Sequence, residues 1–253
     1  MIDAYAKGID ISEWQGDIDL SPYQDQFVII RAGYSITEDK QFRNNVNKCL
    51  SLGIPYGVYW FSEALLPATA GMEADACLKT ISGLDPDLGV WIDMESSAYK
   101  NANGFRPDLY AGEISRMFCQ KMQDSGYYAG VYCSKSWMKY ITPACDAFDK
   151  WIASWGSNDG NINDDTSEYG TILQYTSRLN GKSLDGDICY IDIDQYDSAY
   201  KPHTSGNMDH EMLIKCMAYL TIAGLFGNGE DRRRILGAIY DEIQMEVNRI
   251  YEN

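Results

Sequence analysis

The sequence predicts an α/β protein: a barrel that begins as β/α units and ends in strands joined mainly by loops, followed by a small helical module. Its 253 residues suit one large domain with a small module. The chain is 45% hydrophobic and 23% charged, which is sufficient for a core and unlike the composition of a disordered chain. Short apolar runs recur along it, as in strands that a parallel sheet buries on both faces.

Eight segments have the composition of short strands. The first is GIDIS (8–12), and the other seven are rich in β-branched and aromatic residues: FVIIRA (27–32), GVYWF (57–61), GVWIDM (89–94), YYAGVY (127–132), WIASW (151–155), TILQY (171–175) and ICYIDI (188–193). Between the early strands, residues 40–53 and 108–126 repeat an apolar residue at every fourth position and end at or near a glycine, which predicts helices. Such alternation of strand and helix is typical of βαβ units.

The pattern changes after Trp151. The last three strands follow one another at intervals of about 20 residues, and the polar stretch GSNDGNINDDTSEYG between the first two cannot supply a helix of comparable length. We expect a large domain at residues 1–197, a linker at 198–207 and a helical module at 208–253. Three short helices in that module could only just sustain a core of their own, or they could dock on the barrel.

Charge and histidine content exclude several classes of function. The chain carries 37 Asp and Glu against 21 Lys and Arg, a formal charge of −16, which argues against a nucleic-acid binder because phosphate binding needs basic surface. Its two histidines, His203 and His210, lie near the C-terminus. The large domain therefore has no Ser-His-Asp or Cys-His nucleophile and no His-rich zinc site. Acid/base catalysis there must use carboxylates, tyrosines or lysines.

The cysteines and the N-terminus indicate where the protein is made. Seven dispersed cysteines without a CxxC pair indicate buried, reduced thiols. The N-terminal sequence lacks the basic and then apolar pattern of a signal peptide, and no run of about 18 apolar residues predicts a membrane span. We therefore expect synthesis in a reducing cytoplasm and no insertion into a membrane. No phosphate loop or cofactor motif is present, so we expect no cofactor and no metal; the oligomeric state is left open.

The strongest candidates for chemistry are Asp93 and Glu95, in the segment WIDME. Residues i and i+2 of a strand face the same side, and the C-terminal strand ends of a β/α barrel carry its active site. Two carboxylates held close together cannot both ionise freely, so one pKa should rise toward values useful for a general acid. Taken alone, strand-end acids that cap a helix or pair with an arginine are an equally good interpretation.

Three further carboxylates lie at probable strand ends. Asp10 ends the first strand, although a lone aspartate at such a position more often satisfies the backbone N–H groups of a turn. Asp192 and Asp194 in YIDIDQY repeat the i, i+2 spacing on the last strand. A calcium site is the alternative there, but the segment lacks the central glycine and terminal glutamate of an EF-hand loop.

Aromatic residues also gather at strand ends, where core packing explains most of them. Flat rings can stack on sugar rings, however, and 19 tyrosines with six tryptophans fit a sugar-binding groove. Gln174 could hydrogen-bond an acetamido or hydroxyl group of such a ligand, whereas we interpret Arg31 and Asp39 as a structural ion pair. The candidate aromatic residues are Tyr34, Tyr59, Phe61, Tyr132, Trp155 and Tyr175.

Together these motifs resemble glycoside hydrolase family 25, the lysozyme family of many phage endolysins and bacterial autolysins. The resemblance covers residues 5–197 and rests on GIDISEWQG, FVIIRAGYS, GVWIDMES, KWIASW, LQYTS and YIDIDQY, in that order. An Asp-x-Glu on the fourth strand joined to an Asp at the first is quite specific. The resemblance implies an irregular barrel of eight strands, with five β/α units followed by three strands.

The same resemblance implies an N-acetylmuramidase, which hydrolyses the β-1,4 bond between N-acetylmuramic acid and N-acetylglucosamine in peptidoglycan. By position, Glu95 matches the general acid/base, and Asp93 matches the neighbour that orients or stabilises the acetamido group of the substrate. Asp10 and Asp192 match the other groove carboxylates, whereas Asp194 stands where the family has Asn or Asp. Retention of configuration with assistance by the acetamido group is favoured; a carboxylate nucleophile or an activated water is the alternative.

The tail resembles the short cell-wall-binding repeat attached to some phage lysozymes, through GNGEDRRRILG and YDEIQMEVNRI. Residues 213–250 cover about one copy, and one copy suggests weak wall affinity because the avidity of linked modules is absent. Arg233 and Arg234, with Tyr240, are candidates to meet a peptide or muramyl carboxylate. A solvated helix face is the alternative for these arginines.

The sequence thus predicts a modular peptidoglycan hydrolase whose partner is the bacterial glycan strand. The alternatives are a barrel that binds the wall without activity and a hydrolase of chitin-like glycans. We expect the protein to reach the wall after release by lysis, or by secretion if a leader has been removed.

Overall fold

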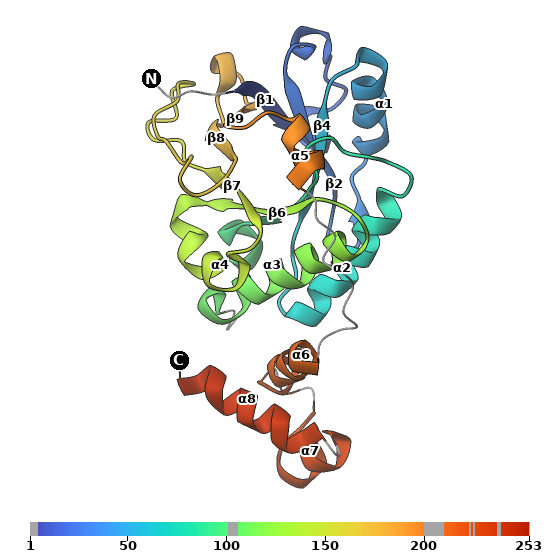
Figure 1. The fold of residues 1–253 in the computed structure, drawn as a ribbon, viewed down its shortest axis with the longest axis vertical. Helices are drawn as coiled ribbons and strands as arrows, with labels where there is room; N and C mark the ends of the chain where they lie inside the picture. Colours follow the sequence, from blue (N-terminus) through green and yellow to red (C-terminus); the bar gives the residue numbers. More distant parts are fainter. Residues whose placement is uncertain are drawn as a thin grey trace.

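Eight strands close into a barrel in the computed structural model, which describes residues 5–100, 106–199, 210–222, 224, 226–236 and 239–252 (Figure 1). The strands are β1 (Ala6–Ile11), β2 (Phe27–Tyr34), β3 (Thr37–Glu38), β4 (Tyr56–Phe61), β5 (Val90–Met94), β6 (Ala129–Ser134), β7 (Asp149–Ala153), β8 (Ile172–Thr176) and β9 (Asp185–Cys189). Neighbouring strands are parallel from β1 through β2 and β4 to β8, and antiparallel β9 joins β8 to β1. The two-residue β3 extends the edge of β2 outside the ring. The predicted barrel is confirmed.

Helices alternate with the strands from β2 to β7 and pack on the outside of the barrel. They are α1 (Phe42–Leu52), α2 (Pro67–Thr80), α3 (Pro107–Asp124) and α4 (Met138–Cys145). The connection from β1 to β2 contains only the 3-10 turns Glu13–Gln15 and Ser21–Tyr23. No α-helix lies between β7 and β9, so the barrel has five β/α units, the first built with 3-10 turns, and then three strands. This is the change of pattern predicted after Trp151.

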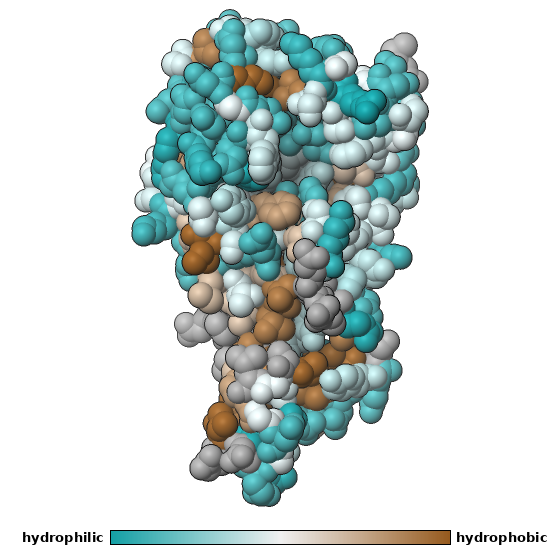
Figure 2. Space-filling model, turned by 180° about the vertical axis from the view of Figure 1, so that it is seen from behind, coloured by the Kyte–Doolittle hydropathy of each residue, from teal (hydrophilic) through white to brown (hydrophobic). Residues whose placement is uncertain are grey.

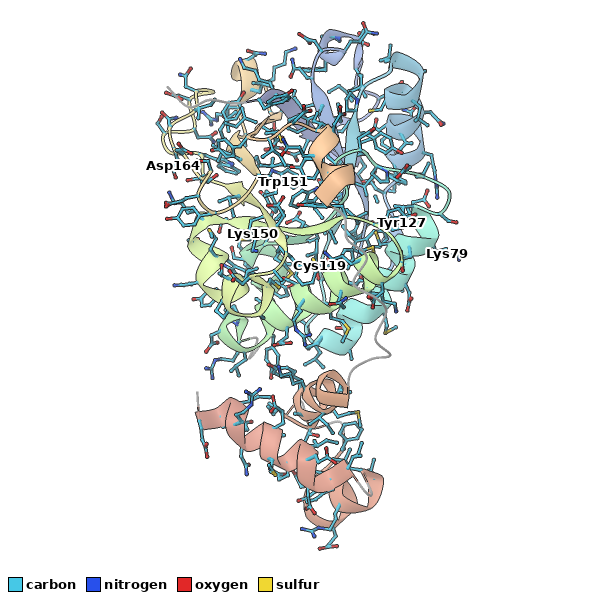
Figure 3. The ribbon with its side chains drawn as sticks, in the orientation of Figure 1. Lys79, Cys119, Tyr127, Lys150, Trp151 and Asp164 are labelled. Carbon is cyan, nitrogen blue, oxygen red and sulfur yellow. The ribbon has the colours of Figure 1, made fainter. Side chains whose placement is uncertain are left out.

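The inside of the barrel is filled mainly by aromatic side chains. Alternation along β7 points Trp151 inward and Lys150 outward (Figure 3), where the ammonium donates to the carbonyl of Cys145 at the end of α4. Gly130 on β6 pairs with Trp91 on β5, and a Cβ at Gly130 would lie 2.3 Å from the indole ring, so only glycine leaves it room. The inward cluster comprises chiefly Phe27, Ile29, Tyr59, Leu88, Trp91, Tyr132, Trp151, Ile172 and Tyr196.

The last strand differs from the prediction. It is β9, not residues 188–193, and the motif YIDIDQY forms the turn after it and the start of the short helix α5 (Asp194–Ala199). Alternating Ile and Asp imitate a strand, but here Asp192 accepts a hydrogen bond from the backbone N–H of Asp194 and so supports a turn. Tyr196, only 1% exposed, closes the barrel at the N-terminal ends of the parallel strands, with its hydroxyl 2.7 Å from Thr171 Oγ1.

Three helices form the C-terminal module, as predicted: α6 (His210–Ile222), α7 (Gly229–Leu236) and α8 (Tyr240–Glu252). Helix α6 contacts both α8 and the barrel helix α2, and Tyr219 of α6 packs edge-on against Tyr110 of α3 with ring centroids 5.2 Å apart. The module therefore docks on the outside of the barrel (Figure 1). In the space-filling view, hydrophobic residues are concentrated over the lower half of the molecule, toward the C-terminal module (Figure 2).

The expected linker at 198–207 is only partly described. Residues 198 and 199 belong to α5, and 200–207 lie outside the described residues. Within the described part of the chain, the helices are all too short or too polar to cross a lipid bilayer.

Candidate active site

The carboxyl ends of the parallel strands surround an open cleft of about 660 Å³. A second hollow of about 320 Å³ shares Glu95, Tyr132 and Trp155 with this cleft. Glu95 therefore lies where the two hollows meet, with space on either side of it. The candidate residues predicted from the sequence that line the cleft are Asp10, Tyr34, Tyr59, Phe61, Asp93, Glu95, Tyr132, Trp155 and Gln174.

Asp93 and Glu95 project from the end of β5 but differ in burial. Asp93 is 4% exposed, and its Oδ1 is buried without a hydrogen-bond partner among the described residues. Burial and the charge of Glu95 raise the pKa of Asp93 well above its usual range, which Arg31 offsets only in part. Glu95, one residue beyond the strand, is half-buried and accepts a hydrogen bond from Ser97 Oγ at 2.7 Å. The sequence predicted one raised pKa within this pair, and the raised pKa is that of Asp93, the more deeply buried residue.

Asp185, which was not predicted from the sequence, also lines the cleft. Because β9 is antiparallel, its first residue lies beside the C-terminal end of β1, where Asp185 pairs with Asp10. Burial and the charge of Glu95 raise the pKa of Asp185 to about 6. Burial likewise raises the pKa of Asp10 well above its usual range. The signal in the sequence was the acidic segment DGD, directly before ICY. This segment begins the strand, and the first residues of a parallel strand would lie at the end of the barrel opposite the cleft.

Gln174 on β8 holds several cleft residues together. Its Oε1 accepts hydrogen bonds from the Tyr132 hydroxyl and from Trp155 Nε1, both at 2.9 Å. Its Nε2 donates to Asp10 Oδ2 at 2.8 Å. The sequence predicted that the Gln174 amide would bind a ligand. In the structure, Tyr132 and Trp155 orient this amide, and the amide in turn orients Asp10.

Three predicted site residues lie away from the cleft. Asp192 and Asp194 follow the C-terminal end of β9, at the opposite end of the barrel, and Asp192 accepts a hydrogen bond from the Tyr5 hydroxyl at 2.7 Å. Tyr175 neighbours Gln174 on β8 and so faces the other side of the sheet, where it packs against Ile188. The expectation that these residues line the groove is not met, because the last strand runs antiparallel and because side chains alternate along β8.

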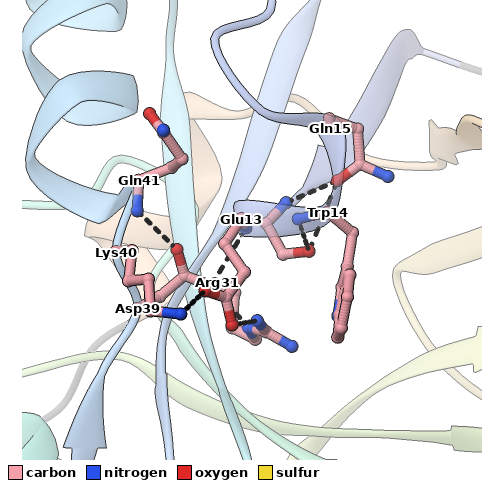
Figure 4. Close-up of polar contacts among 8 residues, drawn as sticks. Glu13, Trp14, Gln15, Arg31, Asp39, Lys40 and Gln41 are labelled. Atoms are coloured by element: carbon pink, nitrogen blue, oxygen red, sulfur yellow. Dashed lines mark hydrogen bonds and ion pairs between the residues drawn. The ribbon is translucent and has the colours of Figure 1, made fainter.

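An ion-pair network fixes one rim of the cleft (Figure 4). Arg31 donates to Asp39 Oδ2 at 2.7 Å and to Glu13 Oε1 at 3.0 Å, which confirms the structural ion pair predicted for Arg31 and Asp39. Lys40 lies 3.4 Å from the other oxygen of Glu13. The network anchors the 3-10 turn that carries Trp14, an 80% exposed cleft residue that was not among the predicted candidates. The signal available in the sequence was the position of Trp14, directly after Glu13 and three residues beyond the end of β1.

Comparison with protein families identifies this barrel. The profile of glycosyl hydrolases family 25 matches residues 9–184, more than half of the chain. The chain belongs to family 25. This family of glycosyl hydrolases is the enzyme class that the motifs predicted. No curated protein sequence matches the chain.

Several solved structures share this fold. The modular autolysin LytC from Streptococcus pneumoniae is 27% identical, with a TM-score of 0.62 over 73% of this chain, which spans only 46% of the length of LytC. A family 25 glycosyl hydrolase from Bacillus anthracis is 24% identical, with a TM-score of 0.64 over 79% of this chain and 96% of that one. The catalytic domain of endolysin ply40 from bacteriophage P40 of Listeria monocytogenes is 22% identical, with a TM-score of 0.61 over 75% of this chain and 95% of that one.

The tail following this family 25 barrel matches the CW_7 repeat over residues 217–251. Arg233 stacks on the ring of Tyr240, with Cζ 4.6 Å from the centroid. Arg232 instead donates to the loop before α7 and to α8, and so holds the module together. Arg234 belongs to α7, but its side chain lies outside the described residues.

Proposed function

We propose that this family 25 barrel hydrolyses the β-1,4 bond between N-acetylmuramic acid and N-acetylglucosamine in peptidoglycan. The convergence of Asp10, Asp93, Glu95 and Asp185 on a cleft with space on both sides of Glu95 carries the proposal. Such a groove suits an extended polymer, and aromatic side chains at its rim suit sugar rings. LytC, whose barrel is similar, was solved with a synthetic peptidoglycan ligand.

In the proposed reaction, Glu95 acts first as the acid and then as the base. It protonates the glycosidic oxygen as the bond to the anomeric carbon breaks, while the acetamido oxygen of the same sugar attacks that carbon from the opposite face. Asp93 orients the acetamido group. Glu95 then takes a proton from the water that opens the intermediate, so that configuration is retained. Asp10 and Asp185 stabilise the positive charge that develops on the sugar ring; Asp185 here takes the place that the resemblance gave to Asp192.

Digestion of purified Gram-positive peptidoglycan tests the proposal. The new ends are reduced and identified by mass spectrometry, with the wild type beside Glu95→Gln. We expect reduced muramic-acid ends from the wild type and a loss of roughly 10²–10⁴-fold in turnover for the variant, which should unfold at the wild-type temperature.

Two other outcomes favour the alternatives. Reduced glucosamine ends would assign the barrel another glycosidase specificity. No new ends, with retained sedimentation on walls, would make the protein a wall-binding protein without activity.

We also propose that the CW_7 repeat binds the wall weakly, and that Arg233, held against Tyr240, pairs with a carboxylate of the muramyl peptide. Co-sedimentation with purified walls, in the Glu95→Gln background, tests this. Arg233→Gln and Arg234→Gln should reduce binding, while Arg43→Gln on α1 removes the same charge far along the chain and should not. Equal binding by all variants would contradict the assignment. The proposed site of action is the bacterial wall, reached after lysis or secretion.

A further inference from the structure

Asp187 is an acidic residue inside the barrel that has no role in the mechanism above. It lies on β9 two residues after Asp185, so both side chains face the interior. Asp187 is 0% exposed, and its Oδ1 accepts a hydrogen bond from Trp151 Nε1 at 2.9 Å. Its Oδ2 is buried and receives no hydrogen bond from any N–H or O–H group of the described residues. A buried carboxylate oxygen without a donor is costly, so this atom requires a physical explanation.

The carboxyl group next to Asp187 is that of Asp10, whose Oδ2 accepts the amide hydrogen of Gln174, the residue that pairs with Asp187 across β8 and β9. The register of β1 and β9 places Asp10 opposite Asp185 and Gly8 opposite Asp187, so that Asp10 and Asp187 are diagonal neighbours on the inward face. Two carboxylate ions cannot hydrogen-bond to one another, because neither carries a proton. One proton held between the two buried carboxyl groups would remove their mutual repulsion and give Asp187 Oδ2 a hydrogen-bond partner.

The surroundings offer the pair little positive charge. Its neighbour on β9, Asp185, is itself an acid, and its charge acts on both members. Tyr59 from β4 and Tyr132 from β6 face Asp10 with hydroxyl groups whose pKa burial raises well above the usual range, so both are neutral. Arg31 lines the same cleft but is bound by two other carboxylates. Burial raises the pKa of Asp187 to about 8.

We propose that Asp187 is a positioning residue that remains protonated and donates its Oδ2–H to the carboxylate of Asp10. Burial raises the pKa of both members, but Asp10 is the one that ionises, because it opens on the cleft and accepts the amide hydrogen of Gln174, whereas Asp187 is fully buried behind it. Every polar atom of Asp187 then has a partner, since Oδ1 accepts from Trp151 and Oδ2 donates. The inference rests on the proposed function in one respect, namely that the negative charge of Asp10 stabilises the positive charge that develops on the sugar ring.

Asparagine mimics a protonated aspartate, and this supplies the test. Asp187→Asn can accept from Trp151 and donate to Asp10, whereas Asp187→Leu keeps a branched side chain with the same number of heavy atoms and does neither. We expect Asp187→Asn to retain peptidoglycan hydrolysis within about threefold of the wild type, and Asp187→Leu to lose about tenfold or more in kcat. Asp10→Asn should inactivate the enzyme, because Asp10 is the member that needs its charge.

Two readouts do not depend on activity, so that failure of the proposed function leaves the inference testable. The infrared band of a protonated carboxylic acid should weaken in Asp187→Asn relative to the wild type near pH 6. The Tm of the wild type should fall relative to that variant as the pH rises through about 8, because ionisation of Asp187 would then place a second charge beside Asp10. An unchanged infrared band, with Asp187→Asn as damaging as Asp187→Leu, would show that Asp187 is ionised and overturn the proposal.

Discussion

Among individual residues, position along the strand decides which acids reach the cleft. Asp185 begins β9 beside Asp10, whereas Asp192 lies beyond the other end of the same strand and contacts Tyr5. The two aspartates are seven residues apart in sequence and at opposite ends of the barrel. Substitution of Asp185 should therefore lower activity, whereas substitution of Asp192 should not.

We expect Asp185→Asn to lower kcat on peptidoglycan by roughly tenfold to a hundredfold, because it removes negative charge beside Glu95. Asp192→Asn, which removes the same charge outside the cleft, should leave kcat within about twofold. Steady-state release of reducing ends by the two variants measures both. Strong inactivation by Asp192→Asn together with a normal Asp185→Asn enzyme would restore the assignment made from the motif.

Glu73 on α2 is a buried acid outside the cleft and supplies a pH-dependent prediction. It accepts hydrogen bonds from Ser62 Oγ at 2.6 Å and from the backbone N–H of Glu63 at 2.9 Å, and burial raises its pKa to about 7. A raised pKa in the folded state means that the protonated form stabilises the fold. This contribution is complete below the usual value of 4.5 and is lost as the pH rises through about 7.

Glu73→Gln should remove this dependence. The Tm of the wild type should fall relative to that of the variant as the pH rises from about 5 to about 8. Glu38→Gln, an exposed glutamate paired with Arg43, is the matched control and should show no such shift. A constant difference for Glu73→Gln across this range would contradict a raised pKa at Glu73.

At the level of elements, β9 and α5 finish the barrel in two different ways. The antiparallel β9 closes the ring against β1 and brings two acids to the interior, while α5 covers the opposite end. Tyr196 is the part of α5 that enters the barrel, where it packs edge-on against Trp91 and Tyr128. The YIDIDQY motif thus closes the end of the barrel that lies opposite the cleft.

Tyr196→Ala should destabilise the fold by about 3–5 kcal/mol, because it leaves a cavity among large aromatic rings. Tyr196→Phe keeps the ring and loses only the hydroxyl contacts with Thr171 and Cys189, so its cost should be about 1 kcal/mol. Urea unfolding followed by tryptophan fluorescence gives both values. Similar costs for the two variants would mean that the ring does not fill the barrel end.

For the molecule as a whole, the C-terminal module is an integral part of the core. Ile214, Ala218 and Tyr219 of α6 are buried in the same cluster as residues of α2 and α3, and Ile243, Val247 and Ile250 of α8 join it. Three short helices alone could barely sustain a core. Docking on the barrel supplies the apolar surface that the module lacks by itself.

Tyr219→Ala should therefore loosen the whole module. We expect the backbone amides of α8 to exchange at least tenfold faster in hydrogen–deuterium exchange, with protection of β5 unchanged. Met245→Ala, at a 72% exposed position on α8, shortens a solvent-exposed side chain of the same helix and is the control. Equal exchange in α8 for both variants would show that the module is stable without its docking contact.

Much of the fold could be predicted because its signals are local. Apolar runs, four-residue repeats and terminal glycines marked the early strands and helices, and the polar stretch after Trp155 marked the loss of helices in the last third. The motif YIDIDQY was misassigned because alternation of Ile and Asp suits a strand and a turn equally well. Only packing of Tyr196 into the barrel distinguishes the two.

The sequence by itself determined the family 25 barrel, its helical tail and the group of Asp10, Asp93 and Glu95, because strand ends and i, i+2 spacing are local properties. The tertiary structure alone decided the direction of β9, and with it the presence of Asp185 in the cleft and of Asp187 behind it. Strand direction depends on pairing with β1 and β8, which are distant in sequence. No local pattern encodes such a pairing, since the same residues alternate identically in a strand of either direction.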